Sequence, residues 1–168
     1  MLEAEVVSAC MDEIEIVQMS EHDLLEVVDL EERSGLSRWG WAAYYAELQG
    51  PQRTLMFIAR RKNRRDDEHI AGYIAARDTA GELHINNVAV DEQYRRKGIG
   101  SALLKAVVQQ GRQLGSITAL LEVRSGNTAA LALYQKCGFT AVARRSNYYS
   151  EPREDATIMS CPLGQLDA

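Results

Sequence analysis

The sequence predicts an α/β protein built on one mixed sheet with helices on both of its faces. Three observations lead to this class. The chain has 168 residues, the usual length of one domain, so we expect a single domain over 1–168. Apolar residues make up 46% of it and charged residues 26%, which is a globular balance. Finally, segments with the two-residue period of strands are interspersed with segments that have the period of helices.

The first half of the chain predicts one strand, two helices and a hairpin. Residues 13–17 alternate weakly between apolar and polar, as a strand does. Residues 21–33 carry apolar side chains at helical spacing, and Ser20 is a suitable N-cap. Residues 39–48 form a second predicted helix, which Gly50 closes. The strand-like segments that follow are 54–60, 70–77 and 82–90.

The second half changes period twice. Residues 98–114 place apolar side chains on one helical face, and Gly115 ends that helix. A short apolar strand follows at 117–123, and residues 127–136 form another helix. The closing strands are expected at 139–145 and 156–161. The centre of the chain is therefore a strand–helix–strand unit, whose strands should be parallel with a right-handed crossover, and the flanking hairpins should be antiparallel.

Composition excludes several classes of protein. Lys plus Arg number 19 and Asp plus Glu number 24, which gives a net charge of −5. An acidic domain is a poor general binder of nucleic acid or of anionic membranes, so we expect neither as a partner. No apolar run reaches the roughly 20 residues of a membrane helix. The first residues are acidic where a secretory signal is basic, and the three cysteines fit no disulfide framework. We therefore expect a cytoplasmic protein.

A block of charge separates two of the predicted strands. Residues 60–68 read RRKNRRDDE. The simpler interpretation is a solvated hairpin turn, and the alternative is a contact with an acidic partner or with RNA.

A basic, glycine-containing segment lies between a predicted strand and a predicted helix. Residues 95–100 read RRKGIG. The first N–H groups of a helix have no partner within it and the helix dipole favours an anion there, so a pyrophosphate would fit. Gly98 and Gly100 let the backbone approach a phosphate closely, and Arg96 and Lys97 add positive charge. The segment is neither a Walker loop nor a dinucleotide fingerprint, and a plain basic turn is the alternative.

One carboxylate stands in an apolar strand. Glu122 lies in the run ALLEV at 119–123, and strands that are apolar on both faces are normally covered on both sides. A carboxylate buried there costs several kcal/mol unless it is paired or faces a water-filled cleft. Glu122 is therefore a candidate general base. The alternative is an ion pair with Arg124 or Arg145.

The segments, taken together, resemble a known family. The motifs are, in order, NVAV at 87–90, RRKGIG at 95–100, LEVRSGN at 121–127, ALALY at 130–134, CGF at 137–139, RSNYY at 145–149 and EDA at 154–156. Their order and spacing are similar to those of the GCN5-related N-acetyltransferase (GNAT) superfamily, in its RimI-type ribosomal-protein-alanine branch. The resemblance covers about 13–162.

The resemblance implies a fold and a cosubstrate. The GNAT fold has a mixed, mostly antiparallel sheet whose central parallel strands splay to admit acyl-CoA, here acetyl-CoA, and it needs no metal. The residues implied in coenzyme binding are Val88, Ala89, Val90, Arg96, Lys97, Gly98, Ile99, Gly100, Ser101 and Asn127. In the family, the backbone of 88–90 holds the pantetheine arm, and an N–H near Val88, at a bulge in the strand, faces the developing oxyanion. Asn127 also fits the N-cap of the following helix, and both roles can hold.

The same resemblance implies the chemistry. Glu122 would take the proton of the amine through a water, the amine would attack the thioester directly, and Tyr134 would protonate the leaving thiolate. Taken without the family, a tyrosine at the position of Tyr134 on its helix is more often a core residue. An α-amino group has a pKa of about 7.7–8.0 and a lysine about 10.4, so at neutral pH the α-amine has the larger neutral fraction. This mildly favours an N-terminal acceptor.

The RimI-type branch acetylates protein N-termini, and its namesake acts on the alanine of the eighteenth small-subunit ribosomal protein. The resemblance therefore implies a protein N-terminus, that of a ribosomal protein among the candidates, as the partner. The pair Tyr148 and Tyr149, expected just after a closing strand, would line it, and without the family this pair is a half-exposed aromatic edge. Trp39 is the candidate on the opposite wall, although Arg38 replaces the proline common in the family and Trp41 also fits.

Two other functions are compatible with these residues. The catalyst could act on a small-molecule amine or on a lysine, against which the tyrosine pair argues. The chain could also be a non-catalytic acyl-CoA sensor, which would need neither Glu122 nor Tyr134. The natural acceptor, the oligomeric state and the need for a partner protein are open at this point.

Overall fold

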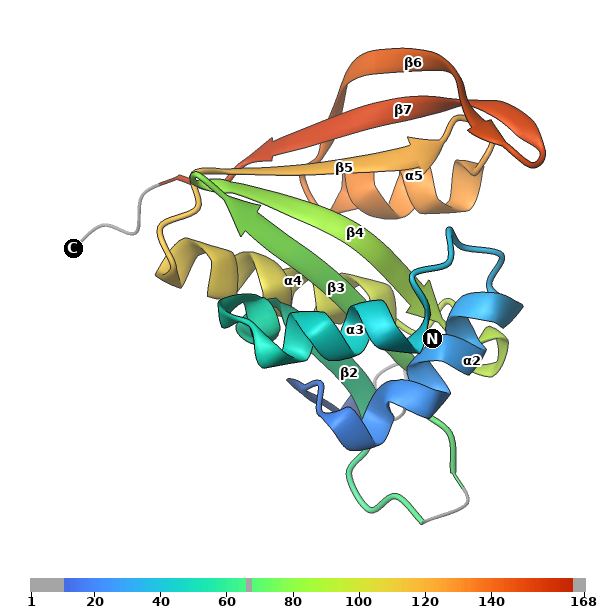
Figure 1. The fold of residues 1–168 in the computed structure, drawn as a ribbon, viewed down its shortest axis with the longest axis vertical. Helices are drawn as coiled ribbons and strands as arrows, with labels where there is room; N and C mark the ends of the chain where they lie inside the picture. Colours follow the sequence, from blue (N-terminus) through green and yellow to red (C-terminus); the bar gives the residue numbers. More distant parts are fainter. Residues whose placement is uncertain (1–10, 66–67, 165–168) are drawn as a thin grey trace, which may run out of the picture. The chain divides into compact units, whose positions relative to one another are not determined.

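The computed structural model describes residues 11–65 and 68–164. Seven strands hydrogen-bond in the order β1-β2-β3-β4-β5-β7-β6 (Figure 1). The pairs β1–β2, β2–β3, β5–β7 and β6–β7 are antiparallel, whereas β4 and β5 are parallel, from Glu82 opposite Thr118 to Ile85 opposite Leu121. The mixed α/β class and the parallel centre are therefore confirmed. The expected splay of the parallel pair stays a prediction.

The predicted elements are present with shifted ends. The strands are β1 (Ile14–Gln18), β2 (Met56–Arg61), β3 (Gly72–Thr79), β4 (Glu82–Val90), β5 (Thr118–Arg124), β6 (Thr140–Ser150) and β7 (Arg153–Pro162). The α-helices are α2 (Leu24–Arg33), α3 (Gly40–Gln49), α4 (Ile99–Gln113) and α5 (Thr128–Lys136). Three short 3-10 helices are η1 (Glu21–Asp23), η2 (Pro51–Leu55) and η3 (Glu92–Tyr94).

The largest difference concerns the last hairpin. Tyr148 and Tyr149 lie inside β6 and do not follow a strand that ends at residue 145. Polar residues at 144–147 interrupt the apolar pattern, which led to the shorter prediction. Pairing with the start of β7, at Tyr149 opposite Glu154 and Ser150 opposite Arg153, extends the strand, and tyrosine is a favourable strand residue.

The chain divides into two compact units. The first consists of Met1–Ala76 with Asn87–Val107, and the second of Arg77–Asn86 with Val108–Ala168. Strands β3 and β4 and helix α4 contribute residues to both. The expectation of a single domain stays a prediction. Within the described part of the chain, no helix combines the length and the apolar character needed to cross a bilayer.

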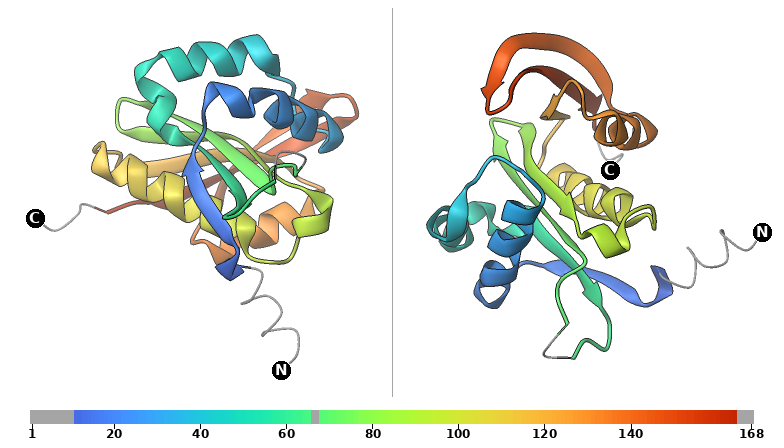
Figure 2. Two further views of the ribbon diagram at one scale, coloured as in Figure 1. Left: turned by 90° about the horizontal axis from the view of Figure 1, so that it is seen from below. Right: turned by 90° about the vertical axis from the view of Figure 1, so that its right-hand side faces the viewer.

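In the first unit, helices cover both faces of the strands. Helices α2 and α3 lie on one side of β2 and β3, and the start of α4 lies on the other (Figure 2). The core between α2, α3 and the strands contains the fully buried side chains of Leu24, Val27, Leu30, Tyr44, Ile58 and Tyr73. On the α4 side, a Cβ on Gly72 would lie 2.7 Å from the Ala89 carbonyl oxygen, so only glycine allows β3 to pass this close to β4.

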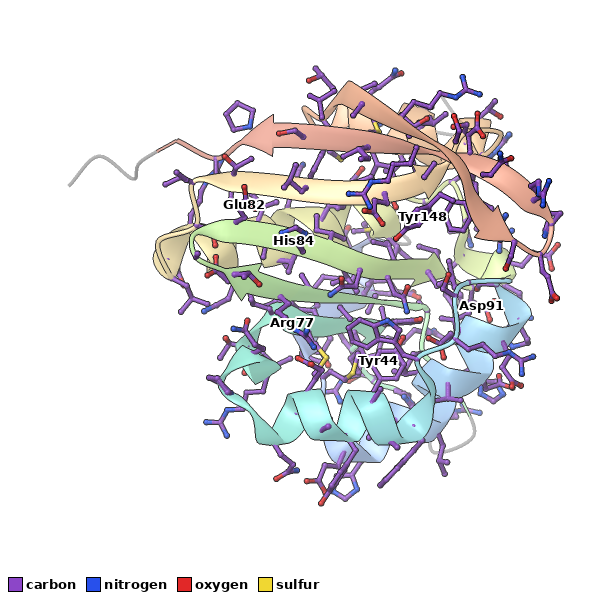
Figure 3. The ribbon with its side chains drawn as sticks, turned by 45° about the horizontal axis from the view of Figure 1, so that its top comes forward. Tyr44, Arg77, Glu82, His84, Asp91 and Tyr148 are labelled. Carbon is purple, nitrogen blue, oxygen red and sulfur yellow. The ribbon has the colours of Figure 1, made fainter. Side chains whose placement is uncertain are left out.

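A buried carboxylate organises the first unit. The Glu31 side chain accepts hydrogen bonds from the backbone N–H groups of Trp39 (2.9 Å) and Gly40 (3.1 Å) at the start of α3. It also accepts from the Tyr44 hydroxyl (2.7 Å) and from Nδ2 of Asn87 in β4 (3.1 Å). Tyr44 points from α3 toward the strands (Figure 3). Four donors satisfy a charge whose burial would otherwise cost several kcal/mol.

The charged loop after β2 is tied to its own chain. Arg61 pairs with Glu13 (3.2 Å) and with Glu68 (2.9 Å), and Arg64 pairs with Glu26. These contacts favour the solvated turn over a docking site for an acidic partner or RNA. Residues 66–67 of this loop lie outside the described residues.

In the second unit, β5 lies between the first residues of β4 and strand β7. Its pairing with β7 runs from Thr118 opposite Pro162 to Arg124 opposite Ala156. Helix α5 runs along β5 (Figure 1). The Tyr134 ring of α5 contacts Phe139 edge to face, with 6.1 Å between centroids. Strands β5 and β6 and helix α5 therefore all belong to the second unit.

Candidate active site

The basic loop of the first unit has the geometry of an anion site. Arg96 (φ +61°) and Gly98 (φ +81°) both adopt the left-handed conformation directly before α4. The first helical hydrogen bond joins the Ala102 N–H to the Gly98 carbonyl oxygen at 3.0 Å. The N–H groups of the first turn therefore have no carbonyl within the helix, and successive N–H groups around a left-handed residue form a concave anion cradle. The loop fits the pyrophosphate expected from the sequence.

The cations of this loop are differently placed. Arg96 is exposed, whereas Lys97 is half-buried and holds its Nζ 5.5 Å from the centre of the Tyr94 ring. Lys97 also lines a surface hollow of about 320 Å³. The other residues of that hollow are Glu13, Ile14, Arg61, Gln93 and Tyr94.

The chain is anchored at the end of β4, at the last residue of the predicted pantetheine segment 88–90 and at the residue that follows it. The Val90 carbonyl oxygen accepts from Nε of Arg95 (3.2 Å). Asp91, the next residue, accepts from Arg33 of α2 (2.9 Å) and from the backbone N–H of Gln93 (3.0 Å). Burial by itself would raise the pKa of Asp91, but these hydrogen bonds outweigh it and lower the pKa. Sequence reasoning missed Asp91, whose position directly after a strand is a cap signal.

The two tryptophans differ in what they contact. Trp39 is half-buried, with its ring 5.3 Å from that of Tyr44 and packed on the core of the first unit. Trp41 is 45% exposed and stacks on Tyr45 at 4.8 Å. The part of Trp39 in acceptor binding stays a prediction, and Trp41 offers the more accessible ring.

Glu122 is not buried, which corrects the expectation from the apolar run. Its side chain is 36% exposed, while its neighbours Leu121 and Val123 are buried. The strand alternates, so only the face opposite to Glu122 is covered. Oε1 of Glu122 lies 3.8 Å from a guanidinium nitrogen of Arg145, and the guanidinium carbon of Arg145 lies 5.6 Å from the centre of the Tyr148 ring. The ion pair with Arg145 is therefore present, and it leaves the carboxylate open to water.

Tyr148 and Tyr149 stand against this carboxylate. Their rings are 5.1 Å apart and perpendicular, and Tyr148 is 46% exposed beside β5 (Figure 3). The hydrogen bond to Glu122, followed by partial burial, raises the pKa of Tyr148. Burial, followed by the charge of Glu122, raises the pKa of Tyr149. The guanidinium of Arg124 covers the Tyr149 ring at 4.1 Å.

The Tyr134 side chain is buried in the second unit. Burial, with smaller contributions from Tyr149 and Cys137, raises the pKa of Tyr134 to about 12. The hydroxyl therefore carries its proton throughout the neutral range. Asn127 caps α5, because its Oδ1 accepts from the Ala130 N–H at 3.1 Å, so that interpretation is confirmed. Its contact with the coenzyme stays a prediction.

The structure thus groups the predicted site residues in two sets. The set in the second unit is a cluster of Glu122, Arg145, Tyr148 and Tyr149. Tyr134 is electrostatically coupled to this cluster, because Tyr149 contributes, after burial, to its raised pKa. In the first unit, residues 88–90 form the end of β4, and residues 96–101 form the loop before α4 and the first residues of that helix. Among residues 11–65 and 68–164, no group of three or more His, Cys, Asp or Glu side chains is arranged to hold a metal ion.

Comparisons with known proteins identify the family of this chain. Residues 24–139 match the model of the acetyltransferase (GNAT) family. The chain is 34% identical over 143 residues to the ribosomal protein bS18-alanine N-acetyltransferase of Escherichia coli strain K12, covering 84% of this chain and 92% of that protein. It is 31% identical over 138 residues to a Bacillus subtilis protein named as a putative enzyme of the same kind, covering 82% and 87%.

Solved structures give the same result. The ribosomal-protein-S18-alanine N-acetyltransferase from Escherichia coli superposes with a TM-score of 0.77 at 31% identity, covering 92% of this chain and 96% of that one. Ard1 from Thermoplasma volcanium superposes with a TM-score of 0.80 at 26% identity, covering 92% and 99%.

The match to the acetyltransferase model over residues 24–139, together with the extent of the similarity to the Escherichia coli enzyme, defines the class of this protein as an N-acetyltransferase. The chain belongs to the acetyltransferase (GNAT) family. The resemblance read from its motifs is thereby confirmed.

Proposed function

We propose that this protein transfers the acetyl group of acetyl-CoA to the α-amino group of a protein N-terminus. The observation that carries the proposal is the solvent-facing carboxylate of Glu122, paired with Arg145 next to the Tyr148–Tyr149 pair, in a member of the GNAT family. The Escherichia coli relative is named for the alanine of ribosomal protein bS18. A ribosomal protein N-terminus is accordingly our first candidate acceptor, and the cytoplasm our proposed place of action.

Most of the groups proposed to hold the coenzyme belong to the first unit. The N–H groups at the start of α4 and the side chains of Arg96 and Lys97 bind the pyrophosphate. The backbone of 88–90 holds the pantetheine arm by strand-like hydrogen bonds. A backbone N–H near Val88 stabilises the oxyanion, and Asn127 contacts the coenzyme arm. We propose that these residues serve one catalytic domain spanning the chain.

The second unit supplies the acid and the base. Glu122 accepts the proton of the α-ammonium group through a water, which its exposure allows. The neutral amine then attacks the thioester carbon and the C–N bond forms. The nitrogen gives its second proton to solvent, and the C–S bond breaks without a covalent enzyme intermediate. Tyr134 donates its proton to the leaving sulfur and recovers one from solvent. The Tyr148–Tyr149 pair, with Trp39 or Trp41, lines the peptide N-terminus.

Release of free thiol from acetyl-CoA tests the proposal. The panel consists of short peptides that begin with Ala, Ser, Met or Gly, and one N-blocked peptide that contains lysine. We expect turnover on free N-termini only, with Ala among the preferred first residues, and loss of turnover in Glu122→Gln. Turnover on the blocked peptide would instead indicate a lysine or small-amine acceptor. Binding of acetyl-CoA without turnover on any peptide would favour the sensor.

A further inference from the structure

Strand β6 is irregular directly before the tyrosine pair. Arg145 stands opposite Ala156 and Tyr149 opposite Glu154, so β6 advances four residues while β7 advances two. Asn147, among the extra residues, has φ +53°, in the left-handed region. The strand therefore bulges over residues 146–148. Bulges change the direction in which side chains leave a strand.

One carboxylate holds this bulge. Oδ1 of Asp155, in β7, accepts from the backbone N–H of Asn147 at 2.9 Å, and Oδ2 accepts from Nε of Arg144 at 2.8 Å. These bonds lower the pKa of Asp155. The Asp155 carbonyl oxygen accepts from the N–H of Ser125, directly after β5. Asp155 thus connects the bulge to the strand end that follows Glu122.

The bulge explains an arrangement that a regular strand cannot produce. Consecutive residues of a regular strand point to opposite faces of the sheet. Tyr148 and Tyr149 nevertheless lie with their rings 5.1 Å apart, and the Arg145 guanidinium, which pairs with Glu122 at 3.8 Å, lies 5.6 Å from the Tyr148 ring. The extra residues in β6 bring the two side chains to the same carboxylate.

We infer that Asp155 is a positioning residue, whose carboxylate keeps the β6 bulge in the form that aims Tyr148 at Glu122. Asp155 acts through the bulge and touches none of the reacting groups. The consequence for acceptor binding rests on the proposed function, whereas the effect on the Tyr148–Glu122 contact does not. The competing explanation is that Asp155 only stabilises the hairpin.

A first measurement does not depend on activity. The titration of Tyr148 is followed by tyrosinate absorbance, as the difference between each protein and its Tyr148→Phe counterpart. In the parent protein, Tyr148 should titrate above the ordinary value of about 10. In Asp155→Ala the pKa of Tyr148 should fall toward that value, because Tyr148 is no longer held against Glu122. Asp155→Asn, which keeps one oxygen for the Asn147 N–H, should lie between the two. An unchanged titration in Asp155→Ala would overturn the inference.

The matched control is Glu151→Gln. It removes one negative charge from the turn of the same hairpin and should leave the Tyr148 titration unchanged. An equal fall of the Tyr148 pKa in this control would mean that the loss of a negative charge, and not the change in the bulge, lowers that pKa. This result would also overturn the inference.

Kinetics supply the second measurement. Asp155→Ala should lower kcat/KM for the peptide by roughly 10- to 100-fold, since small misplacements near reacting groups have effects of this order, while KM for acetyl-CoA is unchanged. In a Tyr148→Phe background the same substitution should cost much less, because residues that act through one another are not additive. Equal losses in both backgrounds would leave Asp155 a purely structural role. If the parent enzyme acetylates no peptide, the proposed function fails, and the titration still decides the inference.

Discussion

At the scale of single residues, Tyr134 and Tyr148 show how the same residue type has its pKa raised by different causes at two positions. Tyr134 is buried, and burial raises its pKa to about 12. Tyr148 is largely open to solvent, and its pKa is raised first by the hydrogen bond to Glu122. Both hydroxyls stay protonated at neutral pH, because a raised pKa moves ionisation further into the alkaline range. Only Tyr134 combines this with exclusion of water, which suits a group that must deliver a proton to one atom.

Replacing Tyr134 by Phe removes the proton but keeps the ring and its contact with Phe139. We expect kcat to fall by roughly 10²- to 10⁴-fold, the usual contribution of a general acid, with little change in the affinity for acetyl-CoA. Steady-state kinetics and equilibrium binding measure the two quantities. Tyr45→Phe, on the exposed side of α3, is the matched control and should retain activity. Full activity in Tyr134→Phe would refute the acid role.

At the scale of elements, the close approach of β3 to β4 determines the position of segment 88–90, which we propose holds the pantetheine arm. A Cβ on Gly72 would stand 2.7 Å from the Ala89 carbonyl oxygen and 3.3 Å from Cδ1 of Leu103. The first of these atoms belongs to the backbone and cannot rotate away. The strands would have to separate to accept any side chain there.

Gly72→Ala should therefore destabilise the protein by about 1–3 kcal/mol, the usual cost of overpacking. It should also weaken acetyl-CoA binding, because it displaces Ala89. Urea denaturation and coenzyme titration measure these effects. Gly50→Ala is the control: its Cβ would lie 3.5 Å from the nearest atom, and its φ of −93° suits any residue. An equal loss in both variants would refute the steric explanation.

The alternation of buried and exposed residues in β5 shows which properties of a strand can be predicted from its own sequence and which cannot. The apolar run 119–123 correctly predicted a strand, but it predicted the burial of Glu122 wrongly. Apolar residues on both faces of a strand favour coverage on both sides. Whether a second layer is actually present depends on distant segments, and those segments are not encoded in the run itself.

At the scale of the whole molecule, a chain of net charge −5 has to bind an anionic coenzyme. Long-range electrostatics oppose this. We therefore propose that the affinity comes from local groups: the N–H groups at the start of α4 and the adjacent Arg96 and Lys97.

Acetyl-CoA should therefore stabilise the folded chain, by about 2.7 kcal/mol at a hundred times its Kd. For a protein of this size that corresponds to a rise in Tm of roughly 5–10 °C. Acetyl-pantetheine, which lacks the pyrophosphate, should give a smaller rise at the same concentration, and so should acetyl-CoA with Arg96→Ala. Thermal denaturation measures all three. Equal shifts for the two ligands would show that the loop does not bind the pyrophosphate.

The sequence by itself determined the class of this protein. Periodicity located the central strand–helix–strand unit and its parallel pair, because periods of two and 3.6 are local properties of the chain. The motif RRKGIG located the anion loop, and the ordered motifs identified the family. Glu122 and Tyr134 were recognised in this way as candidates for the chemistry.

Only the tertiary structure decided how those candidates are held. It showed Glu122 on the open face of β5, the tyrosine pair inside a bulged strand, the Asp155 carboxylate on that bulge, and Glu31 buried among donors from α3 and β4. Each of these contacts joins residues far apart in sequence or depends on the register between strands. A one-residue change of register reverses which face a side chain takes, and a buried charge is tolerated only where distant donors meet it, so neither can be read from local pattern.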